Sequence, residues 1–194
     1  MISKVGIANM ALTLLGADRI LSFDDQTKSA REIKAIYDIS RDEILVGHPW
    51  NFALKRVKLA KLAEEVPHGW RNQFQLPPDY LRKITVYKGK TENDELDEER
   101  FLIEEGKILT NEDQIWLKYI WRNDNPASYS AHFVTAFATK LAYEICFSIT
   151  NDKQLATMLR REYDEKLRIA GAIDTQESSD VWVEGEDWFI KARS

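Results

Sequence analysis

The 194-residue sequence predicts an α+β fold: a four-helix core of two N-terminal and two C-terminal helices, a small antiparallel β insertion, and an extended C-terminal tail. Three observations carry this prediction. Apolar residues recur every three or four positions near both ends of the chain, they alternate with polar residues in its middle, and the last residues are polar and acidic. We therefore expect one domain over residues 1–172 and a tail over residues 173–194.

Composition excludes several classes of protein. The chain has 44% hydrophobic and 30% charged residues, which is an ordinary globular mixture. A chain of this length buries roughly 70% of its unfolded surface, so we expect it to fold without a metal, a cofactor or a disulfide. Cys146 is its only cysteine. No stretch approaches the roughly 20 apolar residues of a membrane span, so we expect synthesis in a cytoplasm and no membrane partner.

Two helices are predicted at the N-terminal end. The first covers about residues 3–15, and Gly16 follows its last apolar residue as a helix-ending glycine does. The second covers about residues 28–46. Ser29 and Glu32 form a capping-box pattern near its start.

The β insertion is predicted over about residues 50–124. Alternation begins near Phe52 and slips by one residue before Leu59, which indicates a strand with a bulge. NQFQLP, RKITVYKG and QIWLKYIW are further strands, FLIEEGKIL is a hairpin with Gly106 at its turn, and PPDYL is a turn.

An acidic segment, TENDELDEER, interrupts these strands. Between Glu92 and Asp113 the chain carries ten acidic and two basic residues, although its whole net charge is only −5. We expect this segment to be an exposed hairpin connection with no buried side. Its acidic residues are Glu92, Asp94, Glu95, Asp97, Glu98 and Glu99.

Two more helices are predicted after the strands. The first, about residues 127–149, is apolar on several sides and is therefore expected to be buried. The second, about residues 152–170, begins after a capping-box pattern of Asn151 and Gln154 and ends near Gly171.

The stretch GHPWNFALKRVKLA mixes a turn, aromatic residues and a row of cations. Trp50 and Phe52 are expected to pack where the helices meet the strands. Lys55, Arg56 and Lys58 then lie on the opposite strand face, as a solvated or subunit-facing surface or as a contact for single-stranded nucleic acid.

Few residues offer catalytic chemistry. The three histidines are far apart in sequence, and no glycine-rich loop joins a strand to a helix. One alternative is a metal-dependent nuclease, because Asp79, Glu105 and Lys107 resemble the degenerate PD…(D/E)xK arrangement. A second alternative is a generic cytoplasmic interaction module.

The tail combines acidic residues with isolated aromatic ones. Val181, Trp182, Trp188 and Phe189 are candidates for a segment that becomes ordered against a partner. Packing of the tail on its own domain is equally compatible with the sequence.

Three stretches resemble the tail tubular protein A family of short-tailed bacteriophages, also called head-to-tail adaptors or gatekeepers, with relatives in prophages. They are IANMALTLLGADRI, ISRDEILVGHPWNFA and LPPDYLR, and the resemblance covers about residues 1–87. Its markers are turn and packing residues without a catalytic group. They are Pro49, Trp50, Phe52, Pro77, Tyr80 and Leu81.

The resemblance implies a structural virion protein of the head–tail neck, assembled in the host cytoplasm and without enzyme activity. It implies a ring, usually a dodecamer, that binds the portal protein and a tail nozzle or tail-tube protein, with double-stranded DNA passing through without sequence-specific binding. We expect the acidic segment to lie at the lumen or tail-side rim, because carboxylates repel phosphates. We expect the tail to bind the portal.

Overall fold

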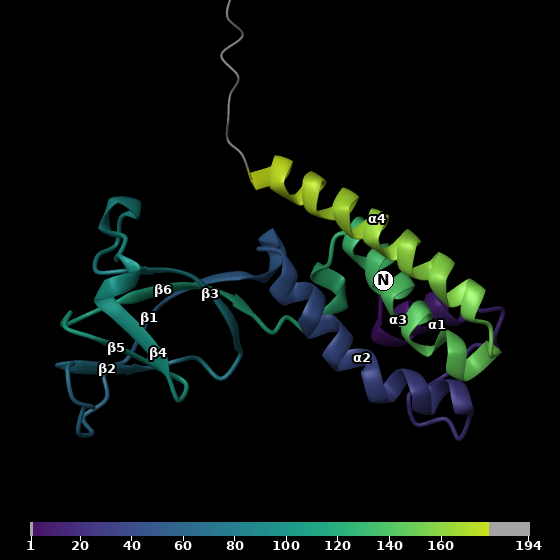
Figure 1. Cartoon of the computed structure of the whole chain (residues 1–194), viewed down its shortest axis with the longest axis horizontal. Helices are drawn as coiled ribbons and strands as arrows, with labels where there is room; N and C mark the ends of the chain where they lie inside the picture. The colour runs from purple at the N-terminus through teal and green to yellow at the C-terminus, as the bar shows by residue number, and fades with distance from the viewer. Residues whose placement is uncertain (1, 179–194) are drawn as a thin grey trace, which may run out of the picture.

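The structure is a computed structural model that describes residues 2–178. Within that range it is an α+β protein with four α-helices and two small antiparallel sheets. The helices gather at one end of the molecule and the strands at the other (Figure 1). The helices are α1 (Lys4–Leu14), α2 (Lys28–Gly47), α3 (Ala131–Thr150) and α4 (Lys153–Ser178). The strands are β1 (Leu54–Lys58), β2 (Asn72–Gln75), β3 (Tyr80–Tyr87), β4 (Phe101–Glu104), β5 (Lys107–Thr110) and β6 (Trp116–Trp121).

The N-terminal helices agree with the sequence prediction in extent but differ in one cap. Gly16 follows α1 with a φ of 64°, which is the left-handed conformation expected of a glycine there. The N-cap of α2 is Thr27, whose hydroxyl accepts a hydrogen bond from the backbone of Ala30. The predicted capping box of Ser29 and Glu32 is therefore wrong, because both residues already lie inside the helix.

The C-terminal helices differ from the sequence prediction more than the N-terminal helices do. Asn151 adopts a left-handed conformation with a φ of 57° and ends α3, so it does not cap α4. Asp152 accepts hydrogen bonds from the backbone of Gln154 and Leu155, which is the geometry of an N-cap. The helix α4 also continues beyond Gly171 to Ser178. The prediction that the tail begins at residue 173 is therefore wrong.

The larger apolar cluster takes residues from all four helices, and α3 contacts each of the other three. Phe133, Phe137, Leu141 and Ile145 form the predicted stripe along α3 and are buried. By length and composition α3 is the one helix in residues 2–178 that could cross a membrane. Its burial among the other helices accounts for its apolar character.

The strands form two three-stranded antiparallel sheets. In one the order is β1-β6-β3, and in the other it is β2-β5-β4. The last strand, β6, therefore lies in the centre of its sheet. The register of β1 against β6 is regular, and the irregularities fall in β3 instead, so the bulge predicted near Leu59 is wrong.

The second apolar cluster joins the two sheets. Val86 and Leu117 come from one sheet and Phe74 and Ile108 from the other. The acidic segment turns back on the end of β3, where Tyr87 and Glu95 form an antiparallel bridge as expected of a hairpin connection, and it then crosses to β4 of the second sheet. It also has a buried side, contrary to the prediction, since Leu96 is 3% exposed and belongs to this cluster.

Candidate functional site

The aromatic residues of the GHPWNF turn are structural. Trp50 is fully buried, and its indole nitrogen donates a 2.9 Å hydrogen bond to the carbonyl of Ile44 at the end of α2. Its ring lies 5.9 Å from that of Phe52 and 5.1 Å from that of Phe133. Both aromatic residues therefore pack at the helix–sheet junction as predicted, and Trp50 is not accessible to a nucleic-acid base.

His48, from the same turn, holds the end of α4. Its Nε2 lies 3.1 Å from a carboxylate oxygen of Asp174, which is 5% exposed. Asn51 adds two further links, since its backbone nitrogen donates to the Asp174 carboxylate at 3.2 Å and its side chain donates to the Asp174 carbonyl at 2.8 Å. This arrangement fixes α4 to the junction.

Asp79, in the PPDYL turn, joins both edge strands of the first sheet to its centre. Its carboxylate accepts hydrogen bonds from Lys55 of β1 at 2.6 Å and from the Tyr119 hydroxyl of β6 at 2.9 Å. Burial raises the pKa of Asp79, but these hydrogen bonds outweigh burial, so the pKa lies below its ordinary value. Asp79 therefore stabilises the first sheet by linking β1 to β6.

The PPDYL turn, which contains the marker residues Pro77, Tyr80 and Leu81, leads directly into β3. The hydroxyl of Tyr80 accepts a 2.8 Å hydrogen bond from the backbone of Lys83, and Leu81 packs against the helical cluster. The backbone nitrogen of Tyr80 donates to the carbonyl of Pro77 at 3.0 Å, which closes the turn. These contacts give the marker residues a structural role.

The nuclease alternative has weak geometric support. Asp79 is held by Lys55 and Tyr119, whereas Lys107 pairs with Glu64 at 3.1 Å in the other sheet. Glu105 occupies the hairpin turn with a φ of 47°. Within residues 2–178 no group of three His, Cys, Asp or Glu side chains could hold a metal ion.

The groove beside the junction is lined by charged side chains that are already paired. It encloses about 680 Å³ between α2, α3 and α4. Lys140 lines it and pairs with Glu43 at 2.7 Å and with Glu144 at 2.6 Å. Burial lowers the pKa of Lys140, but the hydrogen bonds to both carboxylates raise it by more. A lysine inside an apolar helix was the sequence signal for this site, and sequence reasoning missed it.

The acidic segment is folded onto the second cluster. Thr91 and Asp94 exchange hydrogen bonds around a short 3₁₀ turn (Glu92–Asp94), and Glu98 pairs with Lys83. Glu95 and Glu99 are exposed, as is Asp97. The segment therefore presents several carboxylates to the outside while Leu96 anchors it.

A basic pocket lies on the outer face of the first sheet, which sequence reasoning identified only in part. It encloses about 310 Å³. Its lining residues are Arg56, Tyr87, Gly89, Lys90, Thr91, Trp116, Leu117 and Lys118. None of them carries a carboxylate, and Lys58 lies 5.0 Å above the Trp116 ring beside them. Lys118 joins Arg56 through the pairing of β6 with β1, and Lys90 comes from the loop after β3, neither of which the sequence pattern alone reveals.

The aromatic tail residues lie outside the described residues. Val181, Trp182, Trp188 and Phe189 follow the last described helix, which ends at Ser178.

No protein-family model and no curated protein sequence matches the chain.

Proposed function

We propose that this protein is a structural adaptor of the bacteriophage head–tail neck, a ring that binds beneath the portal and forms part of the DNA channel. One observation carries the proposal. The three stretches that resemble the tail tubular protein A family all contribute to the helical apolar cluster, and the second and third are also joined at the helix–sheet junction through the contacts described next.

The contacts at this junction join distant parts of the chain. Arg41 of α2 is 3% exposed and pairs with Asp38 and Asp42 at 2.8 Å each. Asp42 also accepts a 2.7 Å hydrogen bond from Arg122, which follows β6. The backbone of Arg122 in turn donates to the carbonyl of Asp79 in the LPPDYLR stretch at 2.7 Å. Shared structural markers that form one junction support a shared architecture.

In this proposal the four helices form the core of each subunit and the strands are an insertion that extends from it. The ring closes through contacts of two different surfaces on each copy, as heterologous contacts with rotational symmetry do. A tail nozzle or tail-tube protein binds the other face. Double-stranded DNA passes through the ring without sequence-specific binding.

The acidic segment is assigned to the lumen or the tail-side rim. Carboxylates such as Glu95 and Glu99 repel DNA phosphates, and each cation in their place would retain the DNA by an additional contact. A structure of the ring in which this segment lies on the outer wall would refute the assignment.

Electron microscopy of the protein mixed with the portal protein of the same phage tests the proposal. We expect a ring of added density at one end of the portal, with a copy number that the images give directly. Two proteins that stay separate at micromolar concentration would contradict it and would favour a generic interaction module. A protein that is monomeric when free in solution would not contradict the proposal, because the resemblance implies rings that close only on the portal.

The portal contact is assigned to residues 179–194. Deleting these residues is expected to abolish binding to the portal while α4 stays intact. A deletion from residue 173 would not test this, because it also removes Asp174 from the junction. Unchanged portal binding after removal of residues 179–194 would refute the assignment.

A further inference from the structure

The helix α1 presents an uncharged side to the outside. Gly6, Met10, Thr13 and Leu14 form this side, because they recur at three- and four-residue spacing and are exposed. Met10 is 40% exposed and Leu14 is 37% exposed. A helix that is apolar on nearly all sides is normally buried on more than one of them. Within residues 2–178 no element covers this side of α1.

Leu21 extends the apolar side of α1. Its neighbour Ile20 is held against the helix by Asn9, whose side chain donates to the Ile20 carbonyl at 2.9 Å and accepts from the Ile20 backbone nitrogen at 2.8 Å. These hydrogen bonds fix the loop beside α1, yet Leu21 is 92% exposed. Contiguous exposed apolar surface marks an interaction site. Met10, Leu14 and Leu21 are called the α1 face below.

The groove between α2 and α4 lies on the other side of α3. Its lining residues come from α2, α3, α4 and the turn after α2 and none comes from α1, although α1 packs on α3. Its floor continues along α3 from Lys140 to Phe147, which lies two turns further on the same side and is 50% exposed. Ile44, Tyr163 and Leu167 add apolar side chains to its lining.

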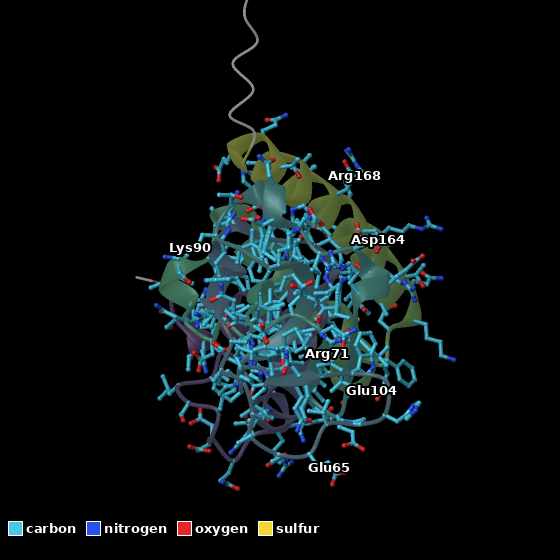
Figure 2. The ribbon with its side chains drawn as sticks, turned by 90° about the vertical axis from the view of Figure 1, so that its left-hand side faces the viewer. Glu65, Arg71, Lys90, Glu104, Asp164 and Arg168 are labelled. Atoms are coloured by element: carbon cyan, nitrogen blue, oxygen red, sulfur yellow. The ribbon has the colours of Figure 1, made fainter. Side chains whose placement is uncertain are left out.

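The charged residues that line the groove already have partners within the chain. Lys140 pairs with Glu43 and Glu144, and Arg168 pairs with Glu165 at 2.8 Å. Figure 2 shows Arg168 at the outer edge of α4. A charged occupant would lose its hydration without gaining a new counter-charge from these residues. The groove therefore suits an uncharged helix, and Lys4 is the one charged residue of α1.

The positions of the face and the groove favour contact between copies. They lie on opposite sides of α3, and two such surfaces join copies head to tail, which is the heterologous contact that closes a ring. The helix α1 has 11 residues and is therefore about 16 Å long. One short helix in a groove covers only part of the roughly 1,200 Å² that a stable interface buries. Association of the free protein is therefore expected to be weak.

We propose that the α1 face of one copy packs into the groove between α2 and α4 of the next copy, with Leu21 against Tyr163 and Leu167. In the ring each α3 is then surrounded by four helices instead of three. This inference rests on the proposed ring and names the contact that closes it. The occupant of the groove is a second copy of this chain.

A charge placed in the α1 face tests the contact on the portal. Leu21→Glu should change the stability of the fold little, because Leu21 is 92% exposed. Its association on the portal is expected to be at least about tenfold weaker than that of the wild type, because the groove offers the new carboxylate no partner. The matched control is Leu102→Glu in β4, where the leucine is 42% exposed, and it is expected to assemble as the wild type does. Full assembly of Leu21→Glu, or an equal loss in the control, would overturn the proposal.

Cysteine cross-linking tests the same contact in the free protein. Leu21→Cys places a thiol in the α1 face, and Ala172→Cys places one in the groove lining. Oxidation of a concentrated mixture of these two variants is expected to give a mixed dimer, which isotope labelling of one variant identifies by mass. Each variant alone is expected to stay monomeric, because a heterologous contact does not bring two copies of one residue together. Cys146 is fully buried and does not compete.

The control mixes Leu102→Cys with Ala172→Cys and is expected to give no mixed dimer. A dimer of Leu21→Cys alone would show a two-fold contact and would overturn the proposal. A mixed dimer that forms only after removal of residues 179–194 would show that those residues occupy the groove of the intact protein, and it would also overturn the proposal.

The outcomes separate this contact from the adaptor function. A mixed dimer from a protein that does not bind the portal would leave the contact standing and refute the adaptor. Portal-bound rings that wild type and Leu21→Glu form equally well would refute the contact and leave the adaptor standing.

Discussion

At the scale of single residues, two aspartates connect parts of the chain that are far apart in sequence. Asp79 joins β1 and β6 through Lys55 and Tyr119, and Asp174 joins α4 to the GHPWNF turn through His48 and Asn51. Neither aspartate belongs to an apolar pattern, so periodicity could not indicate their partners. Sequence reasoning identified Asp79 only as a candidate metal ligand.

Replacing Asp79 with asparagine is expected to lower the free energy of unfolding by about 1 kcal/mol at neutral pH, because the charge-assisted hydrogen bond to Lys55 is lost. The pKa of Asp79 lies below the ordinary 3.8, so its ionised form stabilises the fold above that pH. The difference between wild type and variant should shrink as the pH falls through the native pKa. Urea unfolding at neutral pH and at a pH below the native pKa of Asp79 measures this difference in the free energy of unfolding. A difference that persists in acid would contradict the stabilising role of the ionised Asp79.

Replacing Asp174 with alanine is expected to lower the free energy of unfolding by about 2 kcal/mol, because the backbone nitrogen of Asn51 and the ring of His48 lose their carboxylate partner. Asp164→Ala, on the exposed side of the same helix, is the matched control and should change stability little. Thermal unfolding of the wild type and the two variants measures both changes in stability. Equal stabilities would show that α4 does not depend on this contact.

At the scale of elements, the sequence predicted the order and approximate extent of the helices and strands, and these predictions were confirmed. The errors fall mainly at the ends of helices, apart from the bulge predicted in the first strand. Capping residues compete over one or two positions, as Thr27 with Ser29 and Asp152 with Asn151 show, and local patterns do not decide between them. The helix α4 continues past Gly171, and tertiary contacts of Asp174 with His48 and Asn51, which no local pattern indicates, hold this last part of it.

Truncation distinguishes the contribution of α4 to stability from that of the residues beyond it. A chain ending at Ser178 is expected to unfold at the temperature of the full-length protein, since α4 and Asp174 remain. A chain ending at Ala172 should be less stable by about 2 kcal/mol or more, because it loses Asp174 and the last part of the helix. Calorimetry on both proteins tests this, and a stable protein ending at Ala172 would contradict it.

The β4–β5 turn allows a prediction about stability. Glu105→Asn should stabilise the fold by about 1 kcal/mol, because asparagine tolerates the left-handed conformation better. Urea unfolding of the wild type and the variant measures the difference in the free energy of unfolding. An unchanged or lower value for the variant would contradict the prediction.

At the scale of the whole molecule, the sequence predicted the α+β class but not how the strands divide into two sheets. The β4–β5 hairpin is local and was predictable from Gly106 and the alternation around it. The pairing of β6 with both β1 and β3 is set by contacts between residues far apart in the chain, such as Leu117 with Val86. The basic pocket depends on that pairing, which is why only its β1 cations were identified beforehand.

The separation of Asp79 from Lys107 leads us to expect no nuclease activity. Purified protein incubated with plasmid DNA and Mg²⁺ or Mn²⁺ is expected to leave the DNA intact, since Asp79 and Lys107 are engaged in separate ion pairs. Agarose electrophoresis over several hours is a sufficient assay. Cleavage that Asp79→Asn and Lys107→Ala both abolish would establish the nuclease alternative instead.

The central position of α3 in the helical cluster has a consequence for how the protein is made. On the ribosome, α1 and α2 emerge long before α3, because the whole strand region separates them in the sequence. Until α3 appears, buried residues of α1 and α2 such as Ile7 and Ile33 lack the cover that α3 contributes. A message interrupted within the strand region would therefore yield a fragment with exposed apolar helices, which chaperones and proteases recognise. The helical core is therefore complete only after the strand region and both later helices have been translated.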